Sequence, residues 1–238
     1  MDTRCLGPVL LLTILVAASC ERRAQTPPPA TGGGPSPESS SVERRMAEHF
    51  VATSVMREAL VHGDLDGFAR AAAIIATESD STTPSTKVRD AASRAREAKT
   101  LDAAANALGE LGLACASCHR EHGGPKAVPG EAPEAKKGIE AQMARHRWAA
   151  EVMWQGLISP SDEAWSKGTE VFATAPLVTS AVDPKAETAA QLSVLGVATR
   201  AHFLGEAARE AYTPEARAKA LGEIYATCAE CHRVAAAP

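Results

Sequence analysis

The 238-residue chain is poor in aromatic residues and carries little net charge. Phe, Trp and Tyr make up only 4% of it and runs of β-branched residues are few, so the composition favours helices over strands. The formal net charge of −4 argues against the basic surface that nucleic-acid binding requires. The sequence therefore predicts a helical protein that does not bind nucleic acid.

The first 19 residues resemble a secretory signal, and their apolar run is too short for a comfortable transmembrane helix. Arg4 precedes an apolar run over residues 6–18. The run ends in Ala17-Ala18-Ser19-Cys20, which resembles a bacterial lipobox. We expect lipidation of Cys20 and a lipid anchor on a membrane of the bacterial cell envelope, with the protein facing the periplasm. Ordinary cleavage near Ala18, with Cys20 incidental, is the alternative.

Residues 20–41 contain few large apolar side chains and many Pro, Gly, Ser and Thr residues. Such a segment cannot bury a core, and we expect a disordered tether. A tether directly after a lipidated cysteine would let the folded part stand off the membrane.

The six cysteines leave none for a structural disulfide. Cys5 falls in the signal, Cys20 at its end, and the other four in Cys115-Ala-Ser-Cys118-His119 and Cys228-Ala-Glu-Cys231-His232. Each of these stretches reads C-x-x-C-H, the attachment motif of a c-type haem. Two thiols add to the haem vinyl groups, and His119 or His232 supplies the proximal iron ligand. We expect two covalently bound haem c groups.

Zinc is the main rival cofactor, because C-x-x-C pairs also bind zinc. Cys115, Cys118, His119 and His122 could put four ligands on one helical face. The second motif is followed by Arg233 and Val234 and has no counterpart of His122. The repeat preserves the haem motif and not the extra histidine, which favours haem.

The sequence around the motifs is duplicated. Met46-Ala-x-His49 matches Met143-Ala-x-His146 at an offset of 97, and the segment starting at Thr100 matches the one starting at Thr213 at an offset of 113. We predict a first repeat over residues 42–122, a linker over 123–137, a second repeat over 138–235, and an insertion near 174–189. Two copies can pack about a pseudo-twofold axis, as homodimers do, but the sequence does not show whether they do.

Four helices are expected in each repeat. In the first they cover residues 42–61, the segment capped by Asp64 as far as Ile75, residues 84–99, and the segment capped by Thr100 that carries the motif. Helices of this length suggest an antiparallel bundle. The predicted fold is therefore all-α, with two tandem four-helix modules.

The sixth iron ligand has several candidates. His49 and His146 hold the same register of the first helix in each repeat. Met46 and Met143 lie one turn before them, and Met56 and Met153 lie seven residues after them. All share roughly one helical face, so the spacing alone does not choose between histidine, methionine and an open site. We favour the histidines.

The remaining candidates have weaker patterns. His62 is matched by Ser159, so we expect it to serve the end of its helix, and we expect His122 to be exposed. His202 is an outside candidate for a ligand. We expect the three tryptophans to serve in packing or at an interface: Trp148, Trp154 and Trp165. Arg120 and Arg233 directly follow the motif histidines and could pair with haem propionates; the alternative is that they are ordinary exposed arginines near a helix end.

A C-x-x-C-H motif late in a helical repeat resembles the cytochrome c′ family and its low-spin relatives. The resemblance covers residues 42–122 and 138–235, and it implies four-helix bundles with the sixth iron position facing the first helix. The duplication, and histidine at that position, depart from the family and favour electron transfer. We predict a non-enzymatic electron carrier between redox proteins. A gas-binding or sensing protein, or a peroxidase-like enzyme, is the alternative if one haem is five-coordinate.

Overall fold

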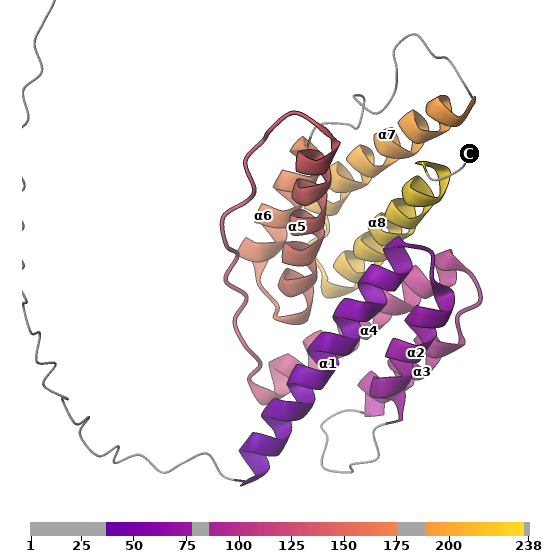
Figure 1. Ribbon diagram of the computed structural model, residues 1–238. Coiled ribbons are helices and arrows are strands. Elements are labelled where there is room, and N and C mark those ends of the chain that lie inside the picture. Colours follow the sequence, from indigo (N-terminus) through magenta and orange to yellow (C-terminus); the bar gives the residue numbers. More distant parts are fainter. Residues whose placement is uncertain (1–36, 78–85, 176–188, 236–238) are drawn as a thin grey trace, which may run out of the picture. The chain divides into compact units, whose positions relative to one another are not determined.

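The computed structural model describes residues 37–77, 86–175 and 189–235, and these fold into eight helices without a strand among them (Figure 1). The all-α prediction is confirmed. The predicted signal over residues 1–19, Cys20 and most of the predicted tether lie outside the described residues.

The first four helices are α1 (Pro37–Val61), α2 (Leu65–Ala76), α3 (Thr86–Glu97) and α4 (Leu101–His122). Helix α1 begins five residues before the predicted start at residue 42. The two predicted caps are present: the Asp64 carboxylate accepts a hydrogen bond from Gly67 N at 2.7 Å, and the Thr100 hydroxyl accepts one from Ala103 N at 3.2 Å. The predicted start of α3 at residue 84 lies outside the described residues.

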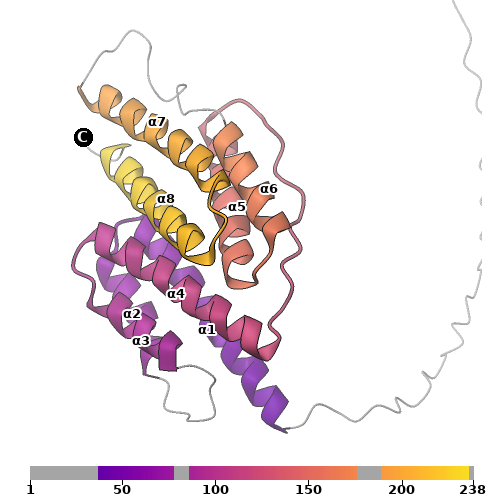
Figure 2. The same ribbon diagram turned by 180° about the vertical axis from the view of Figure 1, so that it is seen from behind.

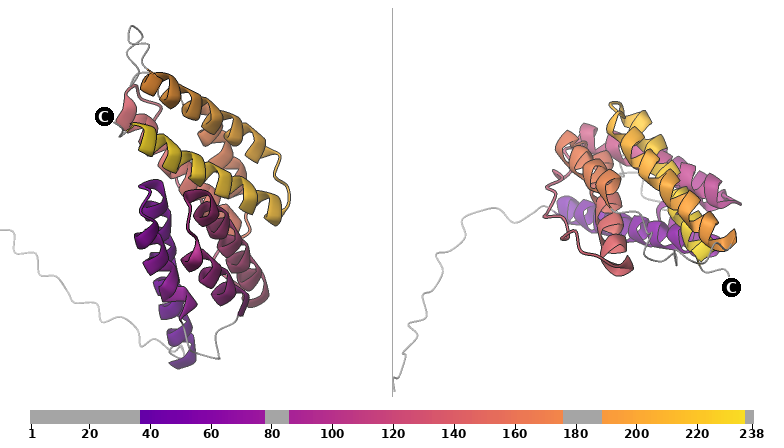
Figure 3. Two further views of the ribbon diagram at one scale, coloured as in Figure 1. Left: turned by 90° about the vertical axis from the view of Figure 1, so that its right-hand side faces the viewer. Right: turned by 90° about the horizontal axis from the view of Figure 1, so that it is seen from above.

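The last four helices are α5 (Ile139–Ile158), α6 (Asp162–Thr174), α7 (Ala189–Arg209) and α8 (Pro214–Ala235), with α7 beside α8 (Figure 3). Their caps repeat those of the first half. Ser161 caps α6 through Ala164 N, and Thr213 caps α8 through Ala216 N. The predicted insertion near 174–189 lies almost wholly outside the described residues.

Helices that are consecutive in each half pack against one another, and the two halves also pack together. The main contact between the halves joins α4 to α8, while α1 also packs on α8 and α5 on α4 (Figure 2). All eight helices contribute to one hydrophobic core and belong to one compact unit. The division into two four-helix modules stays a prediction.

Helices α4 and α8 cross at small residues that the repeats share. A Cβ on Gly109 would collide with the carbonyl oxygen of Ala218, and a Cβ on Gly222 would lie 3.0 Å from that of Ala105. Gly109 and Gly222 are equivalent at the offset of 113, and so are Ala105 and Ala218. Reciprocal contacts of this kind are those of a two-fold interface, here between antiparallel helices of one chain.

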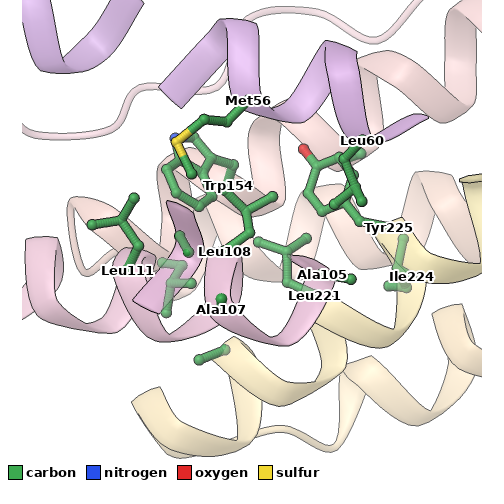
Figure 4. Packing of buried hydrophobic residues seen from close by; sticks show 14 of the residues in the cluster. Met56, Leu60, Ala105, Ala107, Leu108, Leu111, Trp154, Leu221, Ile224 and Tyr225 are labelled. Atoms are coloured by element: carbon green, nitrogen blue, oxygen red, sulfur yellow. The ribbon is translucent and has the colours of Figure 1, made fainter. Parts of the chain in front are cut away.

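Beside this crossing, the first helix of each half packs against the motif helix of the other. Trp154 of α5 lies between Met56 and Leu108, and Tyr225 of α8 lies against Leu60 of α1 (Figure 4). Both rings are buried. Gly112 of α4 leaves the space that Trp154 fills, because a Cβ there would lie 3.0 Å from the indole ring. The pseudo-twofold relation thus extends from α4 and α8 to α1 and α5.

The segment that joins the two halves begins with a tight turn at the end of α4. Gly123 adopts a left-handed φ of 74°, and the N–H groups of Gly123 and Gly124 both donate to the His119 carbonyl at 2.9 Å. Residues 124–136 contain no helix. Lys167 Nζ donates to the Gly130 carbonyl at 3.0 Å, which ties the segment to α6.

Candidate functional site

A cavity of about 630 Å³ opens beside the second C-x-x-C-H motif. Its walls include Cys228, Cys231 and His232 of α8 together with Met143 and His146 of α5. Residues of α1, α6 and α7 complete it. The volume is within the range of about 300–1,000 Å³ typical of cofactor and ligand sites. The structure thus brings the whole second motif together with both sixth-ligand candidates of the same repeat.

His146 is held in a largely apolar part of this cavity. Its ring stacks on Phe172, with the centroids 5.0 Å apart and the planes at 30°. Burial, together with the nearby Arg145 guanidinium, lowers the pKa of His146 to about 4. The imidazole is therefore neutral at pH 7, which is the form that binds a metal ion.

The candidates in the first repeat are placed differently. Met46 and His49 are half-buried on α1, and neither lines the cavity of the second motif, although the next residue, Phe50, does. Met56 and Met153 are fully buried in the core. These two methionines serve in packing, which removes them from the set of sixth-ligand candidates.

His119 of the first motif has a fixed orientation. Its Nδ1 lies 2.7 Å from the carbonyl oxygen of Ile158, at the end of α5. A carbonyl oxygen only accepts hydrogen bonds, so Nδ1 carries the proton and Nε2 has its lone pair available. Gly124 lies against the His119 side chain so closely that a Cβ there would collide with it. Metal-binding histidines commonly donate their second ring N–H in this way.

The ring of His232 in the second motif contacts a side chain, whereas the ring of His119 contacts a backbone carbonyl. The rings of His62 and His232 lie edge to face, with centroids 5.6 Å apart, and His62 Nε2 lies 3.0 Å from Glu58 Oε1. Burial and His62 lower the pKa of His232, while Glu58 opposes the shift. His62 does lie just past the end of α1, as expected, but it also lines the cavity. No sequence pattern indicated this contact, because it crosses between the repeats.

Arg57 is a second cavity residue that the sequence pattern did not single out. Its side chain is 7% exposed, and its Nη2 donates to Glu151 at 2.7 Å and to the Ser54 hydroxyl at 3.1 Å. The guanidinium carbon lies 4.8 Å from the centroid of the Trp154 ring. The buried Nη1 has no hydrogen-bond partner within the described part of the chain.

The four cysteines of the two motifs are free thiols. Burial, together with the second cysteine of each motif, raises the pKa of Cys115 and of Cys228 to about 12. These two thiols are therefore protonated at neutral pH in the metal-free chain. Among the described residues, no three His, Cys, Asp or Glu side chains converge to hold a metal ion. The alternative of a zinc site at Cys115, Cys118, His119 and His122 therefore finds no support in the geometry.

The remaining candidates lie away from the cavity. His122, Arg120 and Arg233 are exposed, as expected for His122. His202 is half-buried beside Phe203, with ring centroids 6.0 Å apart, and it does not line the cavity. Trp165 donates from Nε1 to the Ala208 carbonyl at 2.9 Å. Trp154 and Trp165 are buried and Trp148 packs against the same core, so packing accounts for all three.

Comparison of the chain with protein-family models, curated proteins and solved structures finds no match. None of the helices in the described ranges is both long and apolar enough to span a bilayer.

Proposed function

We propose that this chain is an exported dihaem c-type cytochrome that passes single electrons between redox proteins. It would hold one covalently attached haem in each of two four-helix repeats, as the resemblance to the cytochrome c′ family implies. The observation that carries the proposal is the single cavity that Cys228, Cys231, His232 and His146 line together. Such a set of residues would offer two attachment points and two candidate iron ligands to one haem.

The residues of this cavity suit the chemistry of attachment. Cys228 and Cys231 would each hold the haem by adding across one vinyl group: the S–H bond would break, a C–S bond would form, and the hydrogen would go to the other vinyl carbon. No oxidant or reductant would be consumed. His232 and neutral His146 would supply the two iron ligands. When bound, the haem iron supplies the one-electron couple, while the protein sets its potential through ligands, burial and neighbouring charges.

The first motif supports the same proposal by a different feature. The hydrogen bond from His119 Nδ1 to the Ile158 carbonyl leaves Nε2 available for iron and fixes the ring. We propose that His49 occupies the sixth position there, by its equivalence to His146. Two six-coordinate haems would favour electron transfer over gas binding or peroxide chemistry.

The proposed location depends on the sequence. Residues 1–19 would direct export, and a lipid on Cys20 would anchor the protein to a membrane of the bacterial cell envelope. The folded part would then face the periplasm on its tether and meet soluble or membrane-bound redox partners.

The experiment that tests the proposal is production of the full chain in a bacterium that matures c-type cytochromes. We expect two covalent haems by mass spectrometry and pyridine haemochrome, and low-spin spectra that carbon monoxide leaves unchanged. The double variants Cys115→Ser/Cys118→Ser and Cys228→Ser/Cys231→Ser should each lose one haem. Cys20→Ser should lose the lipid and keep both, which makes it a matched control.

Two outcomes would change the proposal. A chain that carries no covalent haem would refute it. A high-spin component that shifts with carbon monoxide would refute the assignment as a simple electron carrier and favour gas binding or a peroxidase-like activity.

A further inference from the structure

We infer that Arg57, a residue of the first repeat, binds a propionate carboxylate of the haem held in the second repeat. This inference rests on the proposed function, because it presupposes a haem in the cavity beside Cys228 and His232. It goes beyond that function by assigning an anion-binding group that neither motif contains.

The first support is an unpaired buried donor. Arg57 lines the cavity, and its side chain is only 7% exposed. Glu151 and Ser54 both engage Nη2, which leaves Nη1 buried and without a partner in the described ranges. A buried charged donor is costly to leave unpaired, and a guanidinium has five N–H groups and can hold a second carboxylate. The donor set thus fits a carboxylate ligand in the cavity.

The second support is the distribution of charge around the cavity. Arg147 and Glu140 are exposed, Glu58 is 63% exposed, and Glu151 is 34% exposed and already paired with Arg57. Arg57 is therefore the deeply buried cation among the residues that line the cavity. Haem combines an apolar ring with two carboxylates, and an apolar cavity with one buried guanidinium matches this combination.

The third support is that the repeats differ at this position. The counterpart of Arg57 at the offset of 97 is Trp154. Tyr225 lines the same cavity as Arg57, and its counterpart at the offset of 113 is Gly112. Trp154, whose side chain carries no cationic group, fills the space over Gly112. The inference therefore concerns one haem only, and the other haem serves as an internal reference.

The experiment measures both reduction potentials in the purified holoprotein of the wild type and of Arg57→Gln. A nearby positive charge favours the reduced iron, which carries one positive charge less. Arg57→Gln should shift the reduction equilibrium of one haem toward the oxidised iron by up to about tenfold. For a one-electron couple this lowers the reduction potential by up to about 59 mV. The potential of the other haem should not move. Arg44→Gln, at an exposed position of the same helix, should change neither.

A resonance Raman measurement separates propionate binding from a purely structural role. One propionate bending band should shift in Arg57→Gln and stay unchanged in Arg44→Gln. Arg57→Lys keeps the charge but not the planar donor edge, so the band should shift while the potential stays close to wild type. This second variant also tests the inference if Arg57→Gln does not fold.

The outcomes distinguish this inference from the proposed function. Two attached haems with unchanged potentials and propionate bands in the Arg57 variants would overturn the inference alone. A chain without covalent haem would overturn the proposed function as well. Equal shifts at both haems would also overturn the inference, because Arg57 lines the cavity of the second motif.

Discussion

His119 and His232 occupy equivalent positions on repeated helices, yet their neighbours differ in chemistry. The His119 ring donates to the backbone carbonyl of Ile158 and is covered by Gly124. The His232 ring faces His62, which is paired with Glu58. The first site is fixed by backbone, whereas the second is bordered by titratable side chains.

The origin of this difference is the pseudo-twofold arrangement. The end of α5 packs on α4, and the end of α1 packs on α8, so each motif takes part of its surroundings from the other repeat. At the offset of 97, Trp154, Gln155 and Ser159 replace Arg57, Glu58 and His62. Substitutions in one repeat have therefore made the opposite site polar. A duplicated motif can keep its sequence while the electrostatic environment around it diverges.

The largest expected effect tests whether the two sites match at the sixth iron position. His146→Leu removes the neutral imidazole that lines the same cavity as His232, and one haem should change from low to high spin and bind carbon monoxide. His49→Leu should do the same at the other haem. Absorption spectra of the oxidised and reduced holoproteins measure both.

The control for these variants is His202→Leu, because His202 does not line the cavity. Its spectrum should equal that of the wild type. If both haems stay low spin in His146→Leu and in His49→Leu, the sixth-ligand assignment is wrong. A change in His146→Leu alone would show that the two sites differ in ligation as well as in surroundings.

A smaller effect tests the symmetry of the helix crossing. Gly109→Ala puts a methyl group into the backbone carbonyl of Ala218, which cannot yield unless α8 moves, and we expect a loss of about 2–3 kcal/mol in unfolding free energy. Gly222→Ala meets Ala105 O at 3.0 Å, and the better helix propensity of alanine offsets part of the crowding. Its loss should be below about 1 kcal/mol.

Denaturant unfolding of the two glycine variants against the wild type measures this difference. Equal losses in both variants would mean that the crossing is symmetric in solution and that the closer approach at Gly109 is not maintained. Gly196→Ala is the matched control, because a Cβ there would contact no other atom.

Much of the architecture was available from local sequence signals. Asp64 and Thr100 cap helices as predicted, because a capping residue acts on backbone within its own turn. The duplication identified equivalent residues in the two halves. The start of α1 differed by five residues, since helix boundaries depend weakly on any single residue.

The surroundings of the site were not available from the sequence. Arg57 and His62 line the cavity of the second motif although both belong to the first repeat. His62 was discounted because its counterpart is Ser159, an argument that holds only if each repeat builds its own site. Packing between repeats depends on shape at crossings such as Gly109 with Ala218, which no local pattern encodes.

The smallest effect tests the burial of His146 in the haem-free chain. Its pKa is about 4 in the folded state against 6.5 for the free side chain, so the unfolded state takes up the proton first as pH falls. The stability that neutral His146 contributes is complete above pH 6.5 and is lost as pH falls through 4. At 1.36 kcal/mol per pKa unit, reduced for partial exposure, the loss is roughly 2 kcal/mol. Urea unfolding between pH 7 and 4 should show this loss in the wild type and a smaller one in both His146→Leu and His146→Gln. Parallel curves would mean that water reaches the imidazole in the folded chain, and the second site would then lack the apolar surroundings that separate it from solvent.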